Sequence, residues 1–148
     1  MSETPAAPCE LCAQPGGETL WEDAHCRVVR VGGSEGVAFP GFCRVVWREH
    51  VREVSDLDVA GRRHLLGVVT AVERAVRNAV LPDKINLAAF GNKVPHLHWH
   101  VIPRWQDDSH FPEAIWAAPQ RAVPARIAPA SETLRRCLHE ALDEMRMP

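Results

Sequence analysis

Near the middle of the chain, histidine alternates with apolar residues in His96-Leu97-His98-Trp99-His100-Val101-Ile102. Successive side chains of a β-strand point to opposite faces, so this spacing places the three imidazoles on one face. The residues between them then point the other way, into a core. Neighbouring histidines would lie roughly 7 Å apart, at about 3.3 Å rise per residue. The motif therefore predicts a half-buried strand, because a helix would scatter the same residues around its circumference.

Three imidazoles on one face of a strand rarely serve packing alone, and two chemical interpretations are open. His-x-His on a strand can supply two zinc ligands, although no carboxylate lies within the motif. Alternatively, a neutral imidazole, with a pKa near 6.5, can attack phosphorus directly. Neighbouring imidazoles could then orient the nucleophile and protonate a leaving group. Both interpretations predict a functional site on this strand.

Length and charge narrow the class of protein. The chain has 148 residues, with 46% hydrophobic and 24% charged residues, as expected of one globular domain over residues 1–148. The net charge of −2 argues against binding to long nucleic acids. No apolar run approaches the ~20 residues of a membrane span, and residues 1–8 lack the features of a secretory signal. The five cysteines are an odd set, which favours the cytoplasm over a disulfide-bonded exterior.

Local patterns predict an α+β fold built on an antiparallel sheet. Ser55 is the expected N-cap of an amphipathic helix that runs to about Asn78, and Pro82 ends it. Pro103 is expected to end the histidine strand. A second helix, at about 131–147 and capped by Ser131, follows an irregular segment at 103–130. Further strands are expected at 26–31, 41–48 and 85–89, and a glycine-rich loop at 32–36.

The histidine motif resembles the signature of the histidine triad (HIT) superfamily of nucleotide hydrolases and transferases. Three other segments support this resemblance: Ile85-Asn86, the turn Gly91-Asn92-Lys93-Val94, and Val45–Val51 with Leu57. It covers about residues 9–105, with the helix near 131–147 as a C-terminal extension. The resemblance implies a HIT-like fold with a five-stranded antiparallel sheet and two main helices. It also implies a homodimer.

The family's mechanism implies a role for each matching residue. His98 would attack the α-phosphorus and form a nucleotidyl-histidine intermediate, with its ring oriented by the backbone carbonyl of His96. His100 would contact the phosphate and help to protonate the leaving group. Asn86, Asn92 and Lys93 occupy positions where the family contacts the phosphate.

The chain departs from the family at several of these positions. Lys93 stands where the family has a small hydroxyl residue, so it is either a phosphate contact or a solvated surface lysine. The aspartate that binds ribose hydroxyls in the nucleotide-binding branch has no counterpart, and Glu35 is the nearest carboxylate. Phe42 replaces an additional histidine of that branch. Trp105 and Trp116 are candidates for a base-stacking pocket.

A Cys-x-x-Cys pair, Cys9 and Cys12, precedes the predicted sheet. Its spacing suits either two ligands of one metal ion or a redox pair. Some HIT-related proteins hold a structural zinc ion with such a pair, a histidine after the second strand and the first triad histidine. The resemblance therefore implies a zinc site of Cys9, Cys12, His50 and His96. Two reduced cysteines with a helix-capping His50 are the alternative.

The sequence favours a cytoplasmic nucleotide hydrolase or nucleotidyl-transfer enzyme. It would cleave a nucleoside phosphoramidate or dinucleoside polyphosphate at the α-phosphate through His98, without a cofactor in the chemistry itself. Two alternatives remain open: a nucleotide-binding regulatory protein with incidental catalysis, and a zinc hydrolase that uses the triad histidines as ligands.

Overall fold

The computed structural model describes residues 8–146. Most of the polar leader expected at residues 1–8, and the last residue of the helix expected at 131–147, lie outside this range. The elements in chain order are α1 (Glu10–Ala13), β1 (Glu18–Glu22), β2 (Cys26–Arg30), α2 (Gly33–Ala38), β3 (Cys43–Trp47), a 3-10 turn (Val54–Asp56), α3 (Val59–Val80), β4 (Lys84–Ala88), β5 (His98–Arg104) and α4 (Ser131–Met145).

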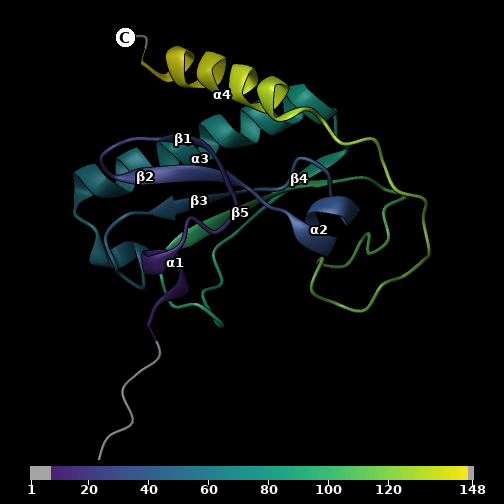
Figure 1. Ribbon diagram of the computed structural model, residues 1–148, viewed down its shortest axis with the longest axis horizontal. Coiled ribbons are helices and arrows are strands. Elements are labelled where there is room, and N and C mark those ends of the chain that lie inside the picture. Colours follow the sequence, from purple (N-terminus) through teal and green to yellow (C-terminus); the bar gives the residue numbers. More distant parts are fainter. Residues whose placement is uncertain (1–7, 147–148) are drawn as a thin grey trace, which may run out of the picture.

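The five strands form one sheet in the order β1-β2-β3-β5-β4, and each neighbouring pair is antiparallel. The two long helices, α3 and α4, lie together on one side of this sheet (Figure 1). The α+β class, the five-stranded antiparallel sheet and the two main helices are therefore confirmed. The sequence patterns did not identify β1 or the four-residue helix α1.

The two faces of the sheet have different cores. On one face, Val45 of β3 and Val101 of β5 pack in the main hydrophobic cluster with α3 and α4. On the other face, Val29 and Val46 pack against Leu11 of α1 in a smaller cluster. Because side chains alternate along a strand, the second face also receives the even-numbered residues of β5.

The N-cap of helix α3 lies three residues after Ser55, the N-cap that the sequence predicted. Asp58 is the N-cap, and its Oδ1 accepts a hydrogen bond of 2.7 Å from the backbone N–H of Gly61. Ser55 instead lies in the 3-10 turn, which the side chains of Glu53 and Asp56 close reciprocally. The helix ends at Val80, and one residue, Leu81, separates it from Pro82.

The predicted glycine-rich loop at 32–36 is instead the start of α2, a short helix. Gly36 permits it, since a Cβ at this position would lie 2.2 Å from the carbonyl oxygen of Val31. The helix therefore packs directly against the end of β2. It carries Glu35 toward the second face of the sheet.

Strand β5 differs from its prediction at both ends. It starts at His98, so His96 precedes the strand, and it continues through Pro103 to Arg104. Backbone N–H groups along a strand alternate between its two neighbours, and the nitrogen of Pro103 is on the side of β3. Strand β3 does not reach this position, because it begins at Cys43, which pairs with Val101. Proline is therefore tolerated there. No ladder hydrogen bond is lost at that position.

The C-terminal helix α4 starts at the predicted Ser131, but its N-cap is Ala130. The Ser131 hydroxyl donates to Glu18 and accepts from Arg30, so it ties the helix to β1 and β2. Leu134, Leu138 and Leu142 on the inner face of this helix are buried, whereas Met145 near its end is exposed. Among the described residues, no helix is both long and apolar enough to cross a membrane.

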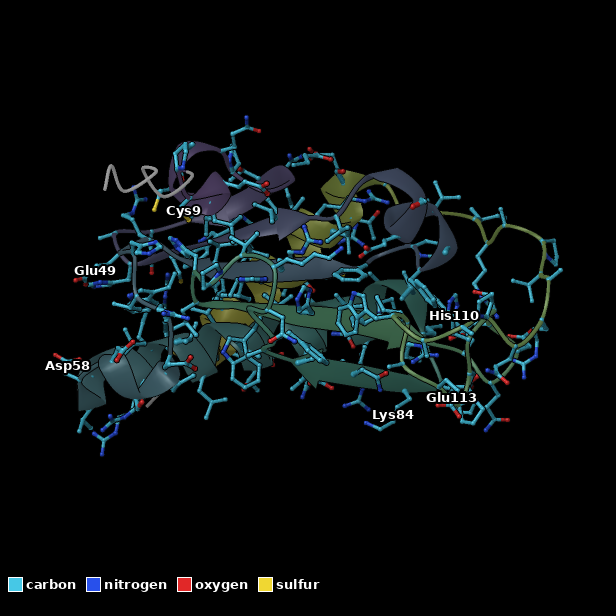
Figure 2. The ribbon with its side chains drawn as sticks, turned by 90° about the horizontal axis from the view of Figure 1, so that it is seen from below. Cys9, Glu49, Asp58, Lys84, His110 and Glu113 are labelled. Atoms are coloured by element: carbon cyan, nitrogen blue, oxygen red, sulfur yellow. The ribbon has the colours of Figure 1, made fainter. Side chains whose placement is uncertain are left out.

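Residues 105–130 contain no helix or strand, as the sequence predicted, and a buried ion pair holds the first part of this segment. The Arg104 guanidinium donates to Asp108 through Nε (2.9 Å) and Nη2 (3.1 Å), and both side chains are 2% exposed. Nη2 also donates to the carbonyl oxygen of Glu113. Figure 2 shows Glu113 and His110 at the end of the molecule opposite Cys9.

We expect replacement of Arg104 by Met to destabilise the protein by about 3–5 kcal/mol, because it leaves the buried Asp108 carboxylate without its cation. The measurement is the free energy of unfolding from urea denaturation. Arg136→Met is the matched control, since Arg136 pairs with Glu140 at the surface and its loss should cost less than about 1 kcal/mol. Equal losses for the two variants would contradict this prediction.

Candidate active site

His98 and His100 lie side by side on the second face of the sheet, because they are two residues apart on β5. Their ring centroids are 5.0 Å apart, and both residues are buried. The register of the sheet places His98 opposite Val46 of β3 and His100 opposite Arg44. Two imidazoles and a guanidinium thus meet on one surface.

The ring of His98 is oriented by the residue that precedes the strand. Its Nδ1 lies 2.5 Å from the carbonyl oxygen of His96, which can only accept, so Nδ1 donates. Nε2 is therefore the nitrogen with the lone pair. Burial lowers the pKa of His98. The hydrogen bond to His96 raises this pKa, and the positive charge of Arg44 lowers it further, so that the net shift is downward. At neutral pH the residue is therefore a neutral imidazole, and its lone-pair nitrogen Nε2 lies on the side of the ring away from the His96 carbonyl oxygen.

His100 has a more apolar environment. The edges of Phe42 and Trp116 meet its ring at centroid distances of 5.8 and 5.0 Å. Burial, followed by the neighbouring His98 and Arg44, lowers the pKa of His100 to about 4. Its Nδ1 is buried and has no hydrogen-bond partner among the described residues.

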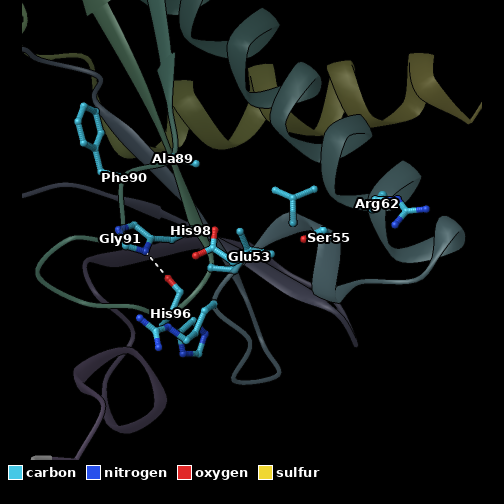
Figure 3. A pocket seen from close by; sticks show the side chains of 11 residues that line it. Glu53, Ser55, Arg62, Ala89, Phe90, Gly91, His96 and His98 are labelled. Carbon is cyan, nitrogen blue, oxygen red and sulfur yellow. Dashed lines mark hydrogen bonds between the residues drawn. The ribbon is translucent and has the colours of Figure 1, made fainter.

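Two cavities meet at His98. The larger, about 490 Å³, is lined by both catalytic candidates and by Glu10, Leu11, Gln14, Gly16, Glu35, Arg44, Phe90, Gly91, Asn92, Lys93, Val94 and Trp116. The smaller, about 420 Å³, contains His96, His98, Glu53, Ser55 and Arg62 (Figure 3). Phe90 and Gly91 line both cavities. A substrate with one group on each side of its reacting centre could therefore place one group in each cavity.

The predicted substrate-binding residues are divided between the cavity and the sheet. Asn92, Lys93 and His100 line the larger cavity. Asn86 lines neither cavity, because its Oδ1 accepts a hydrogen bond of 2.8 Å from Arg104. It therefore supports Arg104 rather than facing His98.

Two aromatic residues form part of the cavity wall. Trp116 and Phe90 are both partly exposed, and their ring centroids are 4.7 Å apart. The other stacking candidate, Trp105, is buried and lies under the guanidinium of Arg126 at 4.2 Å, away from either cavity. Of the two tryptophans, only Trp116 is placed to contact a ligand.

Sequence reasoning missed Arg44 and Phe90 as cavity residues. Arg44 has apolar neighbours on β3, and an arginine in a strand usually reaches solvent. Phe90 is in a turn, where an aromatic residue carries no distinctive signal. The only available signal for Arg44 was its position on the same face as the histidines, which requires the register between β3 and β5.

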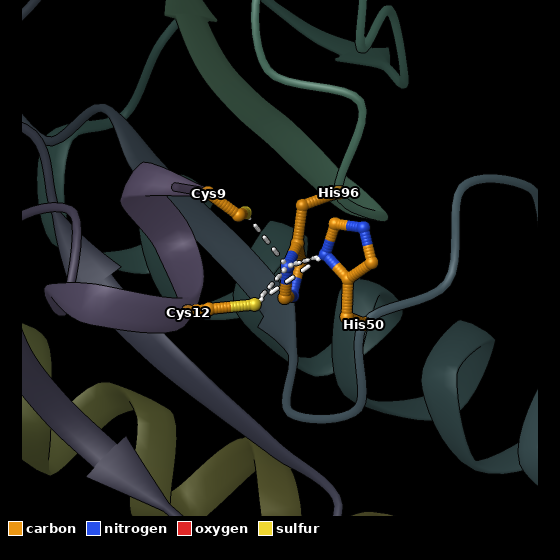
Figure 4. Close-up of side chains that lie close together, drawn as sticks. All are labelled: Cys9, Cys12, His50 and His96. Carbon is orange, nitrogen blue, oxygen red and sulfur yellow. Dashed lines mark hydrogen bonds between the residues drawn. The ribbon is translucent and has the colours of Figure 1, made fainter. Parts of the chain in front are cut away.

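Two sulfur and two nitrogen atoms that could bind a metal ion lie close together where α1, the segment after β3 and the segment before β5 meet. They belong to Cys9, Cys12, His50 and His96 and lie within 4.8 Å of one another (Figure 4). The Nδ1 atom of His96 is 3.4 Å from Cys9 Sγ, 3.5 Å from Cys12 Sγ and 3.2 Å from His50 Nδ1. Cys12 Sγ is 3.4 Å from His50 Nδ1.

These separations fit one tetrahedral zinc ion. Bonds of about 2.3 Å to sulfur and about 2.0–2.1 Å to nitrogen separate neighbouring ligand atoms by roughly 3.3–3.8 Å. The other ring nitrogen of His96, Nε2, lies 2.6 Å from the carbonyl oxygen of Trp47 and donates to it. Nδ1 is therefore free to coordinate, and the ring is fixed by the type of outer hydrogen bond that supports metal-ligating histidines.

A second group with metal-ligand chemistry lies elsewhere, at Asp23, Cys26 and His64. Its geometry has a structural explanation: Asp23 accepts from the backbone N–H groups of His25 and Cys26 and pairs with His64 at 2.7 Å. Within residues 8–146, no group of three or more candidate metal ligands includes His98 or His100.

Solved structures of similar fold come from several bacteria. A histidine triad protein from Bradyrhizobium japonicum has a TM-score of 0.66 and 24% identity, over 97% of this chain and 100% of that one. One from Marinobacter aquaeolei has a TM-score of 0.67 and 26% identity, over 92% and 95%. A zinc-bound histidine triad family protein from Mycobacterium smegmatis has a TM-score of 0.59 and 23% identity, over 92% and 94%.

Among curated proteins, two sequences named AP-4-A phosphorylase, from two strains of Mycobacterium tuberculosis, are 32% identical to this chain over 78 residues. The match covers 49% of this chain but 40% of each relative. The HIT domain family model matches residues 20–107, which is more than half of the chain and includes most of β1 and all of β2 to β5. The chain therefore belongs to the HIT family.

Proposed function

We propose that this protein cleaves a nucleoside phosphoramidate or a dinucleoside polyphosphate at the α-phosphorus, with His98 as the nucleophile. The orientation of His98 is the observation that carries the proposal. Its Nδ1–H is bound to the His96 carbonyl, so Nε2 presents a lone pair beside a cavity large enough for a nucleotide. The AP-4-A phosphorylases of M. tuberculosis support a substrate of the dinucleoside polyphosphate class.

The reaction would proceed in two displacements. In the first, His98 Nε2 forms a bond to the α-phosphorus while the bond from phosphorus to the leaving oxygen or nitrogen breaks, and the leaving group takes up a proton. In the second, water forms a bond to phosphorus, the Nε2–phosphorus bond breaks, and the water loses its proton. The His96 carbonyl stabilises the positive charge that develops on the ring of His98.

His100 would act on the same phosphate. In the free protein it is neutral at pH 7, because its pKa is held near 4 by burial and by the adjacent His98 and Arg44. A neutral imidazole can donate its N–H to a phosphoryl oxygen, and a bound phosphate anion raises the pKa of a nearby histidine. Binding of the substrate would thus prepare His100 to protonate the leaving group.

We also propose that Cys9, Cys12, His50 and His96 bind a structural zinc ion. The ligand separations fit a tetrahedral site, and the M. smegmatis relative was solved with zinc. When bound, zinc would crosslink α1, the segment after β3 and the segment before β5. His96 would then connect the metal site to the nucleophile, because its backbone carbonyl fixes the His98 ring.

The cellular setting is part of the proposal. All five cysteines are free, and a site with two thiolate ligands requires a reducing compartment such as the cytoplasm. A homodimer is also proposed, supported by the edge strand β4 and by the exposed apolar side chains of Leu66 and Leu87.

The first prediction from this proposed function concerns the nucleophile. We expect His98→Ala to reduce kcat/KM for adenylyl phosphoramidates and diadenosine tetraphosphate by at least about 10³-fold, because the covalent step is lost. Wild-type protein that is incubated with a substrate labelled in the α-phosphate, and then denatured without acid, should carry an acid-labile label on His98. The control is His139→Ala, which changes an exposed residue on the outer face of α4 and should retain full activity.

Full turnover by His98→Ala would refute the nucleophile. If nucleotides bind tightly but no conjugate is cleaved, the regulatory binding protein is the correct alternative. Product release that requires inorganic phosphate instead of water would identify a phosphorylase.

The second prediction concerns pH. Free histidine has a pKa near 6.5 in the unfolded chain and His100 has one near 4 in the folded protein, so between these values only the unfolded state binds this proton. Stability from this residue is therefore complete above about pH 6.5 and falls as pH decreases toward 4. In NMR spectra, the His100 ring signals should stay at their neutral positions down to about pH 5. A midpoint near 6.5 would contradict this.

The third prediction concerns the metal. Protein purified without chelator should contain about one zinc ion per chain, and Cys12→Ser should lose most of it. Because the proposed ion is structural, its removal should lower the melting temperature and reduce activity through His98 orientation. If removal of the metal abolishes activity while the fold stays intact, and no label forms on His98 in the zinc-loaded protein, the zinc-hydrolase alternative gains support. A metal-free wild-type protein would refute the site.

A further inference from the structure

Three buried polar atoms without hydrogen-bond partners belong to residues that line the larger cavity. They are Glu35 Oε2, Arg44 Nε and His100 Nδ1. In the described part of the chain the only other such side-chain atom is Trp99 Nε1, whose residue points toward the opposite face of the sheet. Buried polar groups in folded proteins are nearly always paired, so this concentration indicates a missing polar ligand.

Arg44 is the most constrained of the three. It lies opposite His100 in the β3–β5 pairing, and its guanidinium carbon lies 5.7 Å from the centroid of the Phe42 ring. Nη1 donates to the carbonyl oxygen of Gly16 at 3.2 Å. The side chain is thus fixed at one end, while the edge formed by Nε and Nη2 has no hydrogen-bond acceptor among residues 8–146.

Glu35 does not satisfy that edge. Its Oε2 is 3.9 Å from Arg44 Nη2, which is within ion-pair range but too long for a hydrogen bond. The two N–H groups on this edge of a guanidinium are parallel and match two oxygens of a phosphate or carboxylate. The chemistry that would complete the group is therefore an anion with two adjacent oxygens.

We propose that Arg44 is a substrate-binding residue, whose Nε and Nη2 bind two oxygens of a nucleotide phosphate beside His100. This inference deepens the proposed function and rests on it for the identity of the ligand as a nucleotide. Arg44 lies outside the histidine motif and the turn at Gly91–Val94. It would add a fixed cation to a phosphate site in which Lys93 is the other cavity cation.

Binding of a nucleotide and of its matched nucleoside tests this inference without requiring turnover. AMP and adenosine share the base and ribose and differ in the phosphate, so calorimetric titration of both isolates the contribution of the phosphate. We expect Arg44→Gln to weaken AMP binding by about 10–100-fold, as for loss of hydrogen bonds to a charged group. Adenosine binding should change by less than about twofold.

Two further variants serve as controls. Arg44→Lys keeps the charge but removes the parallel pair of donors, so its loss of AMP affinity should be intermediate. Arg74→Gln removes an exposed arginine that pairs with Glu144 on α4, and it should bind AMP like the wild type. If Arg44→Gln does not fold, as judged by circular dichroism, the Arg44→Lys comparison of AMP with adenosine decides the result.

Several outcomes would overturn the inference. They are unchanged AMP affinity in Arg44→Gln, equal weakening of AMP and adenosine, and a wild type that binds neither compound. The first two can occur while conjugates are still cleaved, in which case the proposed function stands. Conversely, Arg44-dependent AMP binding without cleavage of any conjugate supports this inference and refutes the proposed hydrolase.

Discussion

The hydrogen bond from His98 Nδ1 to the His96 carbonyl oxygen is the interaction on which the site depends. It determines which nitrogen of His98 carries the lone pair. It is possible because His96 lies outside β5, where its backbone carbonyl can turn toward the side chain of His98, two residues further along the chain. The side chain of His96 is held separately, by the carbonyl of Trp47 and by its place among Cys9, Cys12 and His50. One residue therefore joins the proposed metal site to the proposed nucleophile.

A second constraint acts from the other end of β5. Arg104 continues the face that carries His98 and His100, and its buried pairing with Asp108 turns the chain back into the segment 105–130. That segment delivers Trp116 to the ring of His100. Asn86 belongs to this support, since it accepts from Arg104. The wall of the cavity is therefore maintained by an ion pair remote from the phosphate contacts.

Strong local signals explain why much of this architecture was predictable. The alternation around His98 identified a strand and its polar face, and Pro82 marked the end of α3 as found. Errors occurred where two local signals competed. Asp58 replaced Ser55 as the N-cap, and Gly36 allowed a helix where glycines suggested a loop. Pro103 remained in the strand because its neighbour had already ended.

The sequence by itself predicted the α+β class, because that class depends on spacing within short segments. Its resemblance to the HIT family supplied the family, the five-stranded sheet and the proposed difference in role between His96 and the pair His98 and His100. Tertiary structure alone decided that Arg44 lies beside His100, that Asn86 supports Arg104, and that Trp116 rather than Trp105 reaches the cavity. These contacts join residues distant along the chain. They depend on strand register and on the path of an irregular loop, neither of which has a local periodic signal.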